Sequence, residues 1–142
     1  MDKIVFITGA SSGIGAGCAR KFASQGASLI LNARNVNKLS ALKEELEKQY
    51  GAKIYLLPFD VRDRKAATSA LESLPKEWQS IDILVNNAGL VIGTDKEQEG
   101  SLDEWDIVID TNIKALLAMT RLIVPGMVER KRGHIIKDRK SV

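Results

Sequence analysis

A glycine-rich segment near the start of the chain, residues 8–15 (Thr-Gly-Ala-Ser-Ser-Gly-Ile-Gly), constrains the fold more than any other feature. It follows an apolar run, residues 4–7, that predicts a buried strand. It precedes Ile14, Cys18 and Phe22, which recur at the spacing of one helix face. A glycine-rich turn between a buried strand and a helix presents the first N–H groups of the helix to an anion. The segment therefore predicts a phosphate cradle, and the alternative is an ordinary glycine turn.

The glycines of this segment have separate expected roles, although their spacing is Gly-x-x-x-Gly-x-Gly rather than Gly-x-Gly-x-x-Gly. We expect Gly9 to permit the tight turn, Gly13 to let the backbone approach a pyrophosphate, and Gly15 to let helix and strand pack closely. The residues predicted to bind a cofactor here are Gly9, Ala10, Ser11, Ser12, Gly13, Ile14 and Gly15.

Length and composition fit one ordinary globular domain. The chain has 142 residues, of which 44% are hydrophobic and 27% charged. No apolar run approaches the roughly 18 residues of a membrane span, and the start leads directly into a strand, so we expect no membrane insertion and no signal peptide. One cysteine excludes an internal disulfide, and one histidine beside it leaves no Cys/His zinc cluster. We therefore expect no metal site, a reducing cytoplasm, and a Cys18 that is a small buried hydrophobe rather than a reactive thiol.

The charge is concentrated at the end of the chain. The formal net charge is +3, but residues 129–142 hold six Lys/Arg against two Asp/Glu, a net of +4, which leaves −1 for the rest. No aromatic residues lie within this basic run. It therefore favours a solvated end over nucleic-acid binding, which remains a minor alternative.

Strand and helix patterns alternate along the whole chain. After the first helix, which we expect Gly26 to end, strands are predicted at residues 28–31, 54–57, 81–85 and from 133 onward. Helices are predicted around residues 39–48, 67–74 and 113–130, with a kink at Pro125. Continuous apolar strands joined by helices predict an α/β fold, a doubly wound, Rossmann-like parallel sheet covered on both faces.

The predicted helices have a capping box, an outer ion pair and apolar faces. Ser101 and Glu104 form an expected capping box before a helix that carries Trp105, Val108 and Ile109. Glu44 and Lys48 are expected to pair on the outer face of the second helix. The expected buried positions of the second and third helices are Leu39, Leu42 and Leu46, and Ala67, Ala70, Leu71 and Leu74. The last helix carries a wide apolar stripe at Ile113, Leu116, Leu117, Met119, Ile123, Val124 and Met127.

In a sheet of this kind the ligand binds beyond the carboxyl ends of the strands, so the residues there indicate the ligand. The second strand ends in Arg34 and Asn35, and no Asp or Glu occurs between Asp2 and Glu44. An acid at this place would hold the ribose hydroxyl of NAD, whereas a guanidinium would bind the 2′-phosphate of NADP and stack on adenine. Arg34 and Asn35 therefore predict NADP, and the alternative is a solvated surface arginine.

The third and fourth strands end in further polar residues. Asp60 and Val61 are predicted to contact adenine, the first by its carboxylate and the second by its backbone; Asp60 as a cap or turn residue is the alternative. After the fourth strand, Asn87, Ala88 and Gly89 would let the backbone lie close to a ribose, while asparagine amides bridge neighbouring strands.

Together these motifs resemble the short-chain dehydrogenase/reductase family over residues 3–136. The glycine segment resembles the family's cofactor motif, Asp60-Val61 its adenine-site pair, and residues 86–89 its Asn-Asn-Ala-Gly motif. The resemblance implies that Asn87 lies near the adenosine ribose. It also implies that Asn112 is the catalytic asparagine, which holds a water linked to the active-site lysine. Residues 1–136 would form the cofactor-binding domain, followed by a charged tail at 137–142.

A narrower similarity concerns the substrate. Residues 74–78, 110–112 and 125–130 resemble the NADP-dependent 3-hydroxy acid dehydrogenases of this family. The resemblance implies oxidation of serine, threonine and related 3-hydroxy acids, or reduction of malonic semialdehyde-like products.

The rest of the family's catalytic set has no counterpart here. The family uses a serine and a Tyr-x-x-x-Lys pair, which places tyrosine and lysine on one helix face. The tyrosines of this chain are Tyr50 and Tyr55, and Ile54 and Phe59 stand four residues after them. Ser141 comes too late for the expected serine. We therefore expect the 142 residues to be inactive alone, and the alternative is a non-catalytic, nucleotide-responsive or partner-binding module.

The final strand and helix also predict self-association. A sheet that ends at its fifth strand has an unpaired edge, and such edges invite association. The wide apolar stripe of the helix at 113–130 needs a cover, since a large bare apolar patch is rare on a soluble monomer.

Overall fold

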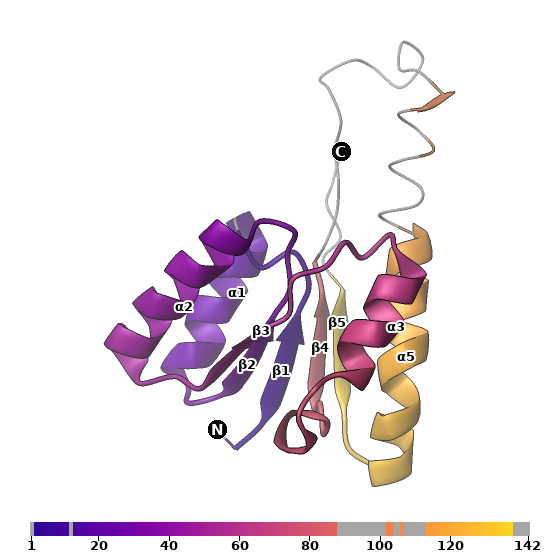
Figure 1. The fold of residues 1–142 in the computed structure, drawn as a ribbon. Helices are drawn as coiled ribbons and strands as arrows, with labels where there is room; N and C mark the ends of the chain where they lie inside the picture. The colour runs from indigo at the N-terminus through magenta and orange to yellow at the C-terminus, as the bar shows by residue number, and fades with distance from the viewer. Residues whose placement is uncertain (1, 12, 88–101, 104–105, 107–112, 138–142) are drawn as a thin grey trace.

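The strands form one doubly wound sheet with helices on both faces (Figure 1). The computed structural model describes residues 2–11, 13–87, 102–103, 106 and 113–137. Within them five parallel strands pair in the order β3-β2-β1-β4-β5. The strands are β1 (Ile4–Ile7), β2 (Ser28–Leu31), β3 (Ile54–Leu56), β4 (Ile83–Asn86) and β5 (His134–Lys137). The predicted fold class is confirmed.

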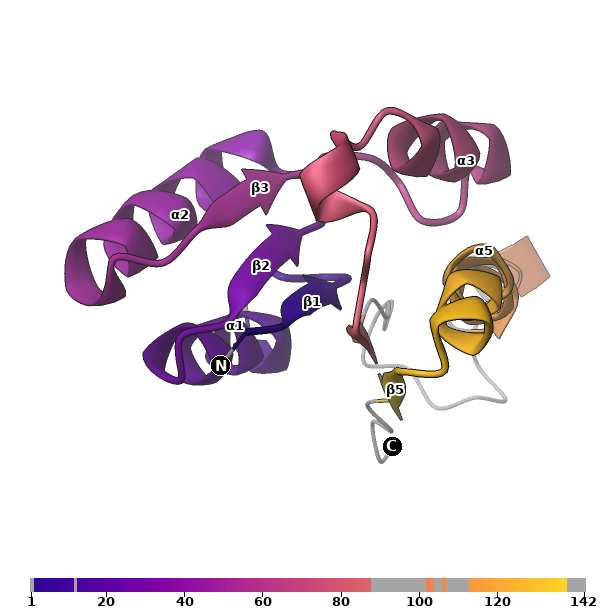
Figure 2. The ribbon, with the colours of Figure 1, turned by 90° about the horizontal axis from the view of Figure 1, so that it is seen from below.

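Helices cover both faces of the sheet, as the end-on view of Figure 2 shows. One face carries α1 (Gly13–Ser24) and α2 (Val36–Tyr50), and the other carries α3 (Arg64–Glu72) and α5 (Ala115–Arg130). A short 3₁₀ turn, η1 (Lys76–Trp78), leads into β4.

Alternation along the strands divides the core between the two faces. Val5 and Ile7 pack in the cluster with α1 and α2, whereas Phe6, between them, packs in the cluster with α3 and α5. All three side chains are fully buried. Because successive strand residues point to opposite faces, a run that is apolar throughout is buried only when both faces are covered.

Most of α2 follows its sequence pattern. Leu39, Leu42 and Leu46 are buried, and Glu44 and Lys48 form an ion pair of 3.2 Å. Gly51 ends the helix with a left-handed φ of 63°, a conformation that favours glycine. Gly26, after α1, is also left-handed, with a φ of 84°.

The buried face of α1 differs from the expected one. Ile14 is 55% exposed, and Cys18 and Phe22 are only partly buried against the core. The buried positions of α1 are Gly15, Ala16, Ala19 and Ala23. Small residues face the sheet because α1 lies close to it, so its larger side chains lie at the margin of the contact.

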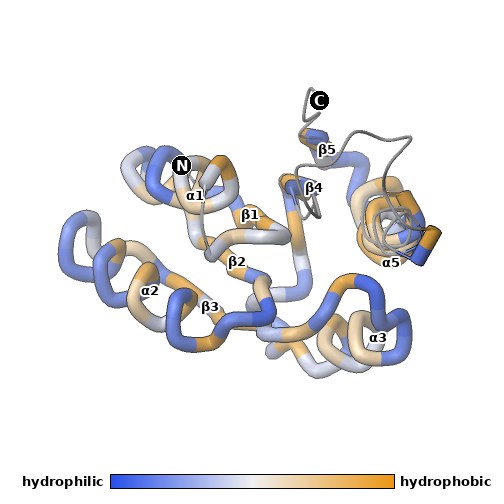
Figure 3. Tube along the Cα trace, turned by 90° about the horizontal axis from the view of Figure 1, so that it is seen from above, coloured by the Kyte–Doolittle hydropathy of each residue, from blue (hydrophilic) through white to orange (hydrophobic). Residues whose placement is uncertain are grey.

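The apolar stripe of α5 is only partly buried. Ala115, Met119, Ile123 and Met127 are buried, whereas Ile113 and Leu117 are 54% and 60% exposed. In Figure 3, which looks along α5, much of this helix is coloured hydrophobic. Contact with α3 and β4 covers one part of this stripe and leaves the other part exposed. α5 is assigned as one helix through Pro125.

Element ends differ from the predictions by one to two residues. α3 ends at Glu72, so the buried Leu74 follows the helix. β4 begins at Ile83 rather than residue 81, and β5, an exposed edge strand, extends to Lys137. The predicted Ser101–Glu104 capping box and Trp105, Val108 and Ile109 lie outside the described residues. In the part of the chain that the structure describes, no helix is long and apolar enough to cross a membrane, and no group of three metal-ligating side chains occurs.

Candidate functional site

The glycine-rich turn is held between the ends of three neighbouring strands. The N–H of Thr8 donates to the carbonyl of Val85 at 3.0 Å. On the other side, the N–H of Ala10 donates to the carbonyl of Asn32 at 2.8 Å. The turn that follows β1 is thus fastened to the ends of both β2 and β4. The candidate site therefore lies at the carboxyl edge of the sheet, where ligands of this architecture bind.

Asn87 connects the end of β4 to the glycine turn. Its backbone N–H donates to Thr8 Oγ1 at 3.0 Å, and its Nδ2 donates to the carbonyl of Gly9 at 3.0 Å. The remaining amide oxygen, Oδ1, is buried and has no hydrogen-bond partner among the described residues. A buried acceptor without a donor costs about 1–3 kcal/mol. This oxygen therefore suits a hydroxyl donor from a bound ligand, and the ribose predicted from the sequence provides one.

Gly15 has no room for a side chain. A Cβ at this position would lie 2.1 Å from the carbonyl oxygen of Gly9 and 2.5 Å from Asn87 Nδ2. The sequence predicted close packing of helix and strand at the third glycine, and the contact found there joins the helix to the residues that follow β1 and β4. Gly9 and Gly13 are needed for a different reason, because they adopt left-handed φ angles of 61° and 60°.

The start of α1 is the electropositive end of the turn. Gly13 opens the helix, and the first turn contains no acidic residue. The aligned N–H groups and the helix dipole therefore remain available to an anion. Of the other residues in the motif, Ala10 is buried, Ser11 is half-buried and Ile14 is exposed, so only part of the motif lines an accessible surface.

Arg34 and Asn35 lie between β2 and α2, as predicted. Arg34 is exposed. Asn35 is the N-cap of α2, and its side-chain oxygen accepts from the N–H of Lys38 at 3.1 Å. The first turn of α2 has no acidic residue either. An anion at this position would meet a guanidinium and a second helix N-terminus, with no carboxylate in that turn to oppose it.

Asn32 stabilises this edge of the sheet through its side chain, although the sequence analysis did not single it out. It is 1% exposed, and its Nδ2 donates to the carbonyls of Leu57 and Phe59, both at 3.1 Å. The side chain thereby ties the end of β2 to the segment that leaves β3. The signal in the sequence was a polar residue directly after the apolar run of β2.

Asp60 is bound by Arg62 rather than open to a ligand. Arg62 Nη2 donates to Oδ2 at 2.7 Å, Nε lies 3.1 Å from both oxygens, and the Arg62 N–H donates to Oδ1 at 2.9 Å. The hydrogen bond from the Arg62 side chain is the main reason that the pKa of Asp60 is lowered, and the nearby charge of Arg34 contributes. This geometry matches the turn-residue alternative, and an adenine amino group would have to share the carboxylate with Arg62.

The residue after Asp60 has a core role. Val61 is 8% exposed and packs in the core cluster with α3 and α5, so only its backbone remains for the predicted adenine contact. The neighbouring Asp63 caps α3, because its side chain accepts from the N–H of Ala66 at 3.0 Å.

The remaining predicted residues are Ser12, Ala88, Gly89 and Asn112, and they lie outside the described residues. Ile113 and Lys114, directly after Asn112, are π-helical, and short π segments are frequent at functional sites. Asn86 Nδ2 donates to Thr120 Oγ1 at 3.2 Å, which links the end of β4 to α5.

A glycine turn ahead of a helix N-terminus, at the edge where parallel strands end, defines a dinucleotide-binding protein of the Rossmann class. At the same edge Asn87 Oδ1 is buried without a described partner, and Gly15 lies in close contact with Gly9 and Asn87. The family model for short chain dehydrogenases matches residues 3–137, and the chain belongs to this family.

The chain is similar to several known members. It is 47% identical over 133 residues to the NADP-dependent 3-hydroxy acid dehydrogenase YdfG of Escherichia coli K12. The matched region covers 94% of this chain and 52% of that protein. Its fold matches the crystal structure of serine dehydrogenase from Escherichia coli with a TM-score of 0.86 and 47% identity, over 94% of this chain and 60% of that one. A closed form of serine dehydrogenase complexed with NADP⁺ matches with a TM-score of 0.84 and 46% identity, over 94% of this chain and 52% of that one. The chain thus spans about half the length of the curated relatives it matches.

Proposed function

We propose that the chain is the cofactor-binding part of an NADP-dependent short-chain oxidoreductase. The observation that carries the proposal is the assembled carboxyl edge, where Gly15, Asn87 and the turn after β1 contact one another. The relatives named NADP-dependent 3-hydroxy acid dehydrogenase and the NADP⁺ complex support the choice of cofactor.

In this proposal each part of the edge binds one part of the cofactor. The turn and the start of α1 hold the pyrophosphate, Asn87 Oδ1 accepts from a ribose hydroxyl, and Arg34 binds the 2′-phosphate. The backbone of Val61 and the side chain of Asp60 border the adenine. When bound, the cofactor would supply or accept the hydride of the reaction.

Cofactor preference is the sharpest test. A partly solvated guanidinium–phosphate pair contributes on the order of 1.5–3 kcal/mol, or roughly ten- to a hundredfold in affinity. Titration of the purified chain with NADPH and NADH, followed by nucleotide fluorescence, should show tighter NADPH binding. Arg34→Ala should remove that preference and leave NADH binding unchanged, while Lys21→Ala, a basic residue in the last turn of α1, serves as the control. Equal affinities for the two nucleotides would refute the assignment of Arg34.

The proposed reaction is transfer of a hydride between NADP and the hydroxyl or carbonyl group of a small 3-hydroxy acid. Asn112 is the catalytic residue that we assign within this chain, because it falls where the family has its catalytic asparagine. The 142 residues contain no Tyr-x-x-x-Lys pair. The purified chain should therefore give no absorbance change at 340 nm with NADP and serine, and sustained turnover would contradict this expectation.

The alternative function is a nucleotide-responsive or partner-binding module that uses the same half of the fold. The observation in its favour is that neither tyrosine is followed by lysine at the fourth position. The nucleotide sequence downstream of residue 142 separates the two proposals: an open reading frame that continues into a serine loop and Tyr-x-x-x-Lys supports the enzyme, and a stop codon supports the module.

We also propose that the chain associates with itself and works in a reducing cytoplasm. On α5 and just before it, Ile113, Leu117, Leu122 and Val128 are 54%, 60%, 37% and 69% exposed. The edge strand β5 adds Ile135 and Ile136, at 38% and 44% exposure. A second copy would cover this apolar surface and lower its free energy in water. The lone Cys18 supports a compartment in which thiols stay reduced.

A further inference from the structure

The Asp60 carboxylate lies near Arg34, the residue proposed to bind the 2′-phosphate of the cofactor. Arg34 follows β2 and Asp60 follows β3, and these two strands pair in parallel. The Asn32 side chain donates to the carbonyl of Phe59 at 3.1 Å, which holds the two segments together. The pKa of Asp60 is lowered mainly by the hydrogen bond from the Arg62 side chain, and the charge of Arg34 lowers it further. The charges of Asp60 and Arg34 are therefore close enough to interact.

A carboxylate at this place opposes the binding of NADP. A phosphate monoester carries about 1.5 to 2 negative charges near pH 7, and a neighbouring carboxylate repels it. An ionised Asp60 without a counter-ion would also compete with the 2′-phosphate for Arg34. In folds of this class an acid beside the ribose favours NAD over NADP. Preference for NADP is therefore strengthened when the charge of Asp60 is neutralised from within the protein.

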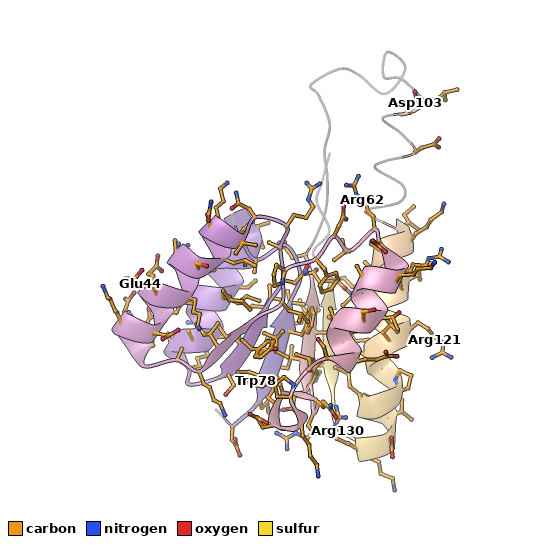
Figure 4. All side chains as sticks on the ribbon, in the orientation of Figure 1. Glu44, Arg62, Trp78, Asp103, Arg121 and Arg130 are labelled. Atoms are coloured by element: carbon orange, nitrogen blue, oxygen red, sulfur yellow. The ribbon has the colours of Figure 1, made fainter. Side chains whose placement is uncertain are left out.

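Arg62 provides this neutralisation. Its Nη2 donates to Asp60 Oδ2 at 2.7 Å, its Nε lies 3.1 Å from both carboxylate oxygens, and its backbone N–H donates to Oδ1 at 2.9 Å. Each oxygen thus has two nitrogens of this one residue within hydrogen-bond distance. The side chains of Arg62 and Asp60 are only 30% and 32% exposed, which limits screening of the pair by water and salt. Figure 4 places Arg62 near the upper ends of α3 and α5, at the end of the molecule where the strands of Figure 1 finish.

The turn that contains both residues holds the pair by contacts within the chain. The Asp63 N–H donates to the carbonyl of Asp60 at 2.9 Å, and the Asp63 side chain caps α3 by accepting from the Ala66 N–H at 3.0 Å. The backbone of residues 60–63 is thereby fixed, and the Arg62 side chain returns to the carboxylate two residues before it. A pair that is formed in advance loses less entropy when a ligand binds beside it.

We propose that Arg62 is a specificity-determining residue, which favours NADP over NAD by neutralising the Asp60 carboxylate beside the 2′-phosphate site. Arg62 acts through Asp60 and is therefore a positioning residue, whereas Arg34 binds the phosphate itself. With the carboxylate paired to Arg62, the 2′-phosphate meets less repulsion and Arg34 is left to bind it. This role rests on the proposed function, because it requires NADP at Arg34.

The test compares the affinities for NADPH and NADH in two backgrounds, by fluorescence titration of the purified chain. Both nucleotides carry the same adenine, so the ratio of their dissociation constants cancels any change in the adenine contact. Arg62→Gln should lower the preference for NADPH by about three- to tenfold when Asp60 is present. In Asp60→Asn, which has no carboxylate charge to neutralise, the same substitution should change the ratio by less than about twofold.

Three further readouts separate neutralisation of charge from a structural role of the turn. Arg62→Lys keeps the positive charge and should retain most of the preference, although lysine cannot form the fork. The loss in Arg62→Gln should shrink as the salt concentration rises, because salt screens the repulsion between Asp60 and the phosphate. Lys65→Gln removes one exposed positive charge from the first turn of α3. It is the matched control and should change the ratio by less than about twofold.

The outcomes distinguish failure of this role from failure of the proposed function. A wild-type chain that does not prefer NADPH would refute the assignment of Arg34 and the role of Arg62 with it. If the wild type prefers NADPH and Arg62→Gln keeps that preference, only the role of Arg62 is wrong. An equal loss with and without the Asp60 carboxylate would also overturn it, because Arg62 would then act without Asp60. Circular dichroism checks that each variant is folded, and Arg62→Met replaces Arg62→Gln if the latter is not.

Discussion

Gly15→Ala is the substitution whose effect the structure predicts most sharply. The new methyl group would lie 2.1 Å from the carbonyl oxygen of Gly9 and 2.5 Å from Asn87 Nδ2. Both are far inside van der Waals contact, and the first atom is backbone, so the turn or the helix must move. Overpacking of this kind costs about 1–3 kcal/mol. Displacement of Asn87 from Gly9 also weakens a hydrogen bond of 3.0 Å, whose net contribution is about 1 kcal/mol.

An opposing term comes from helix propensity, because alanine is favoured over glycine inside a helix by about 1 kcal/mol. The net loss in the free energy of unfolding should therefore be about 1–3 kcal/mol. Gly17→Ala is the matched control, since Gly17 lies two residues further along α1 and a Cβ there would meet nothing within 4 Å. That control should stabilise the protein by up to about 1 kcal/mol.

Equilibrium urea unfolding followed by circular dichroism measures both variants under one set of conditions. The midpoint should fall for Gly15→Ala and rise for Gly17→Ala, with unchanged slopes. The same samples titrated with NADPH should show weaker binding only for Gly15→Ala, because only that substitution disturbs the turn. If Gly15→Ala is as stable as Gly17→Ala, the proposed contact between helix and turn is wrong.

Three further predictions concern the charged groups and the exposed helix. The interaction of ionised Asp60 with Arg62 lowers the pKa of Asp60, so it stabilises the fold fully above about pH 4, the ordinary carboxyl value, and is lost as the pH falls through the folded-state pKa. The difference in the free energy of unfolding between wild type and Asp60→Asn should therefore shrink below about pH 4, and a pH-independent difference would contradict this expectation. Asp82 accepts hydrogen bonds from the Ile4 N–H at 3.0 Å and from Arg132 Nε at 2.9 Å. Asp82→Ala should therefore lower the free energy of unfolding by about 1–3 kcal/mol, whereas Arg132→Gln should lower it by less than about 1 kcal/mol, and equal losses in urea unfolding would contradict this reasoning. Leu117→Glu should shift light-scattering chromatography toward monomer, and a wild-type chain that is already monomeric at all concentrations would show self-association to be wrong.

The location of the candidate site could be predicted because it depends on local patterns. Apolar runs marked the strands, and parallel connections place all their carboxyl ends at one edge. The positions of Gly9, Arg34 and Asn87 along the chain were therefore sufficient to place them at that edge. The individual contacts were not predictable in the same way. Nothing local indicates that Arg62 would occupy both oxygens of Asp60, because arginine at that spacing can equally extend into solvent.

The buried faces of the helices show the same limit. Ile14 and Leu117 fit a helical apolar period, yet both are exposed. Ala16 and Ala19 carry little hydrophobic signal, yet both are buried. A helix that approaches the sheet closely buries its small residues, and the distance of approach is set by the sheet and the neighbouring helices rather than by the period of one helix.

The sequence by itself determined the fold class, the alternation of strands and helices along the chain, and the turns at Gly9 and Gly26, because these depend on continuous apolar runs and on backbone angles that favour glycine. Only the tertiary structure decided that Asn87 would bind Gly9 across 78 residues and leave its amide oxygen without a described partner. It likewise decided that Arg34, which follows β2, would lie near the Asp60 carboxylate, which follows β3. Contacts between residues this far apart in the sequence depend on how the crossover helices pack on the sheet, and no short stretch of sequence determines that packing.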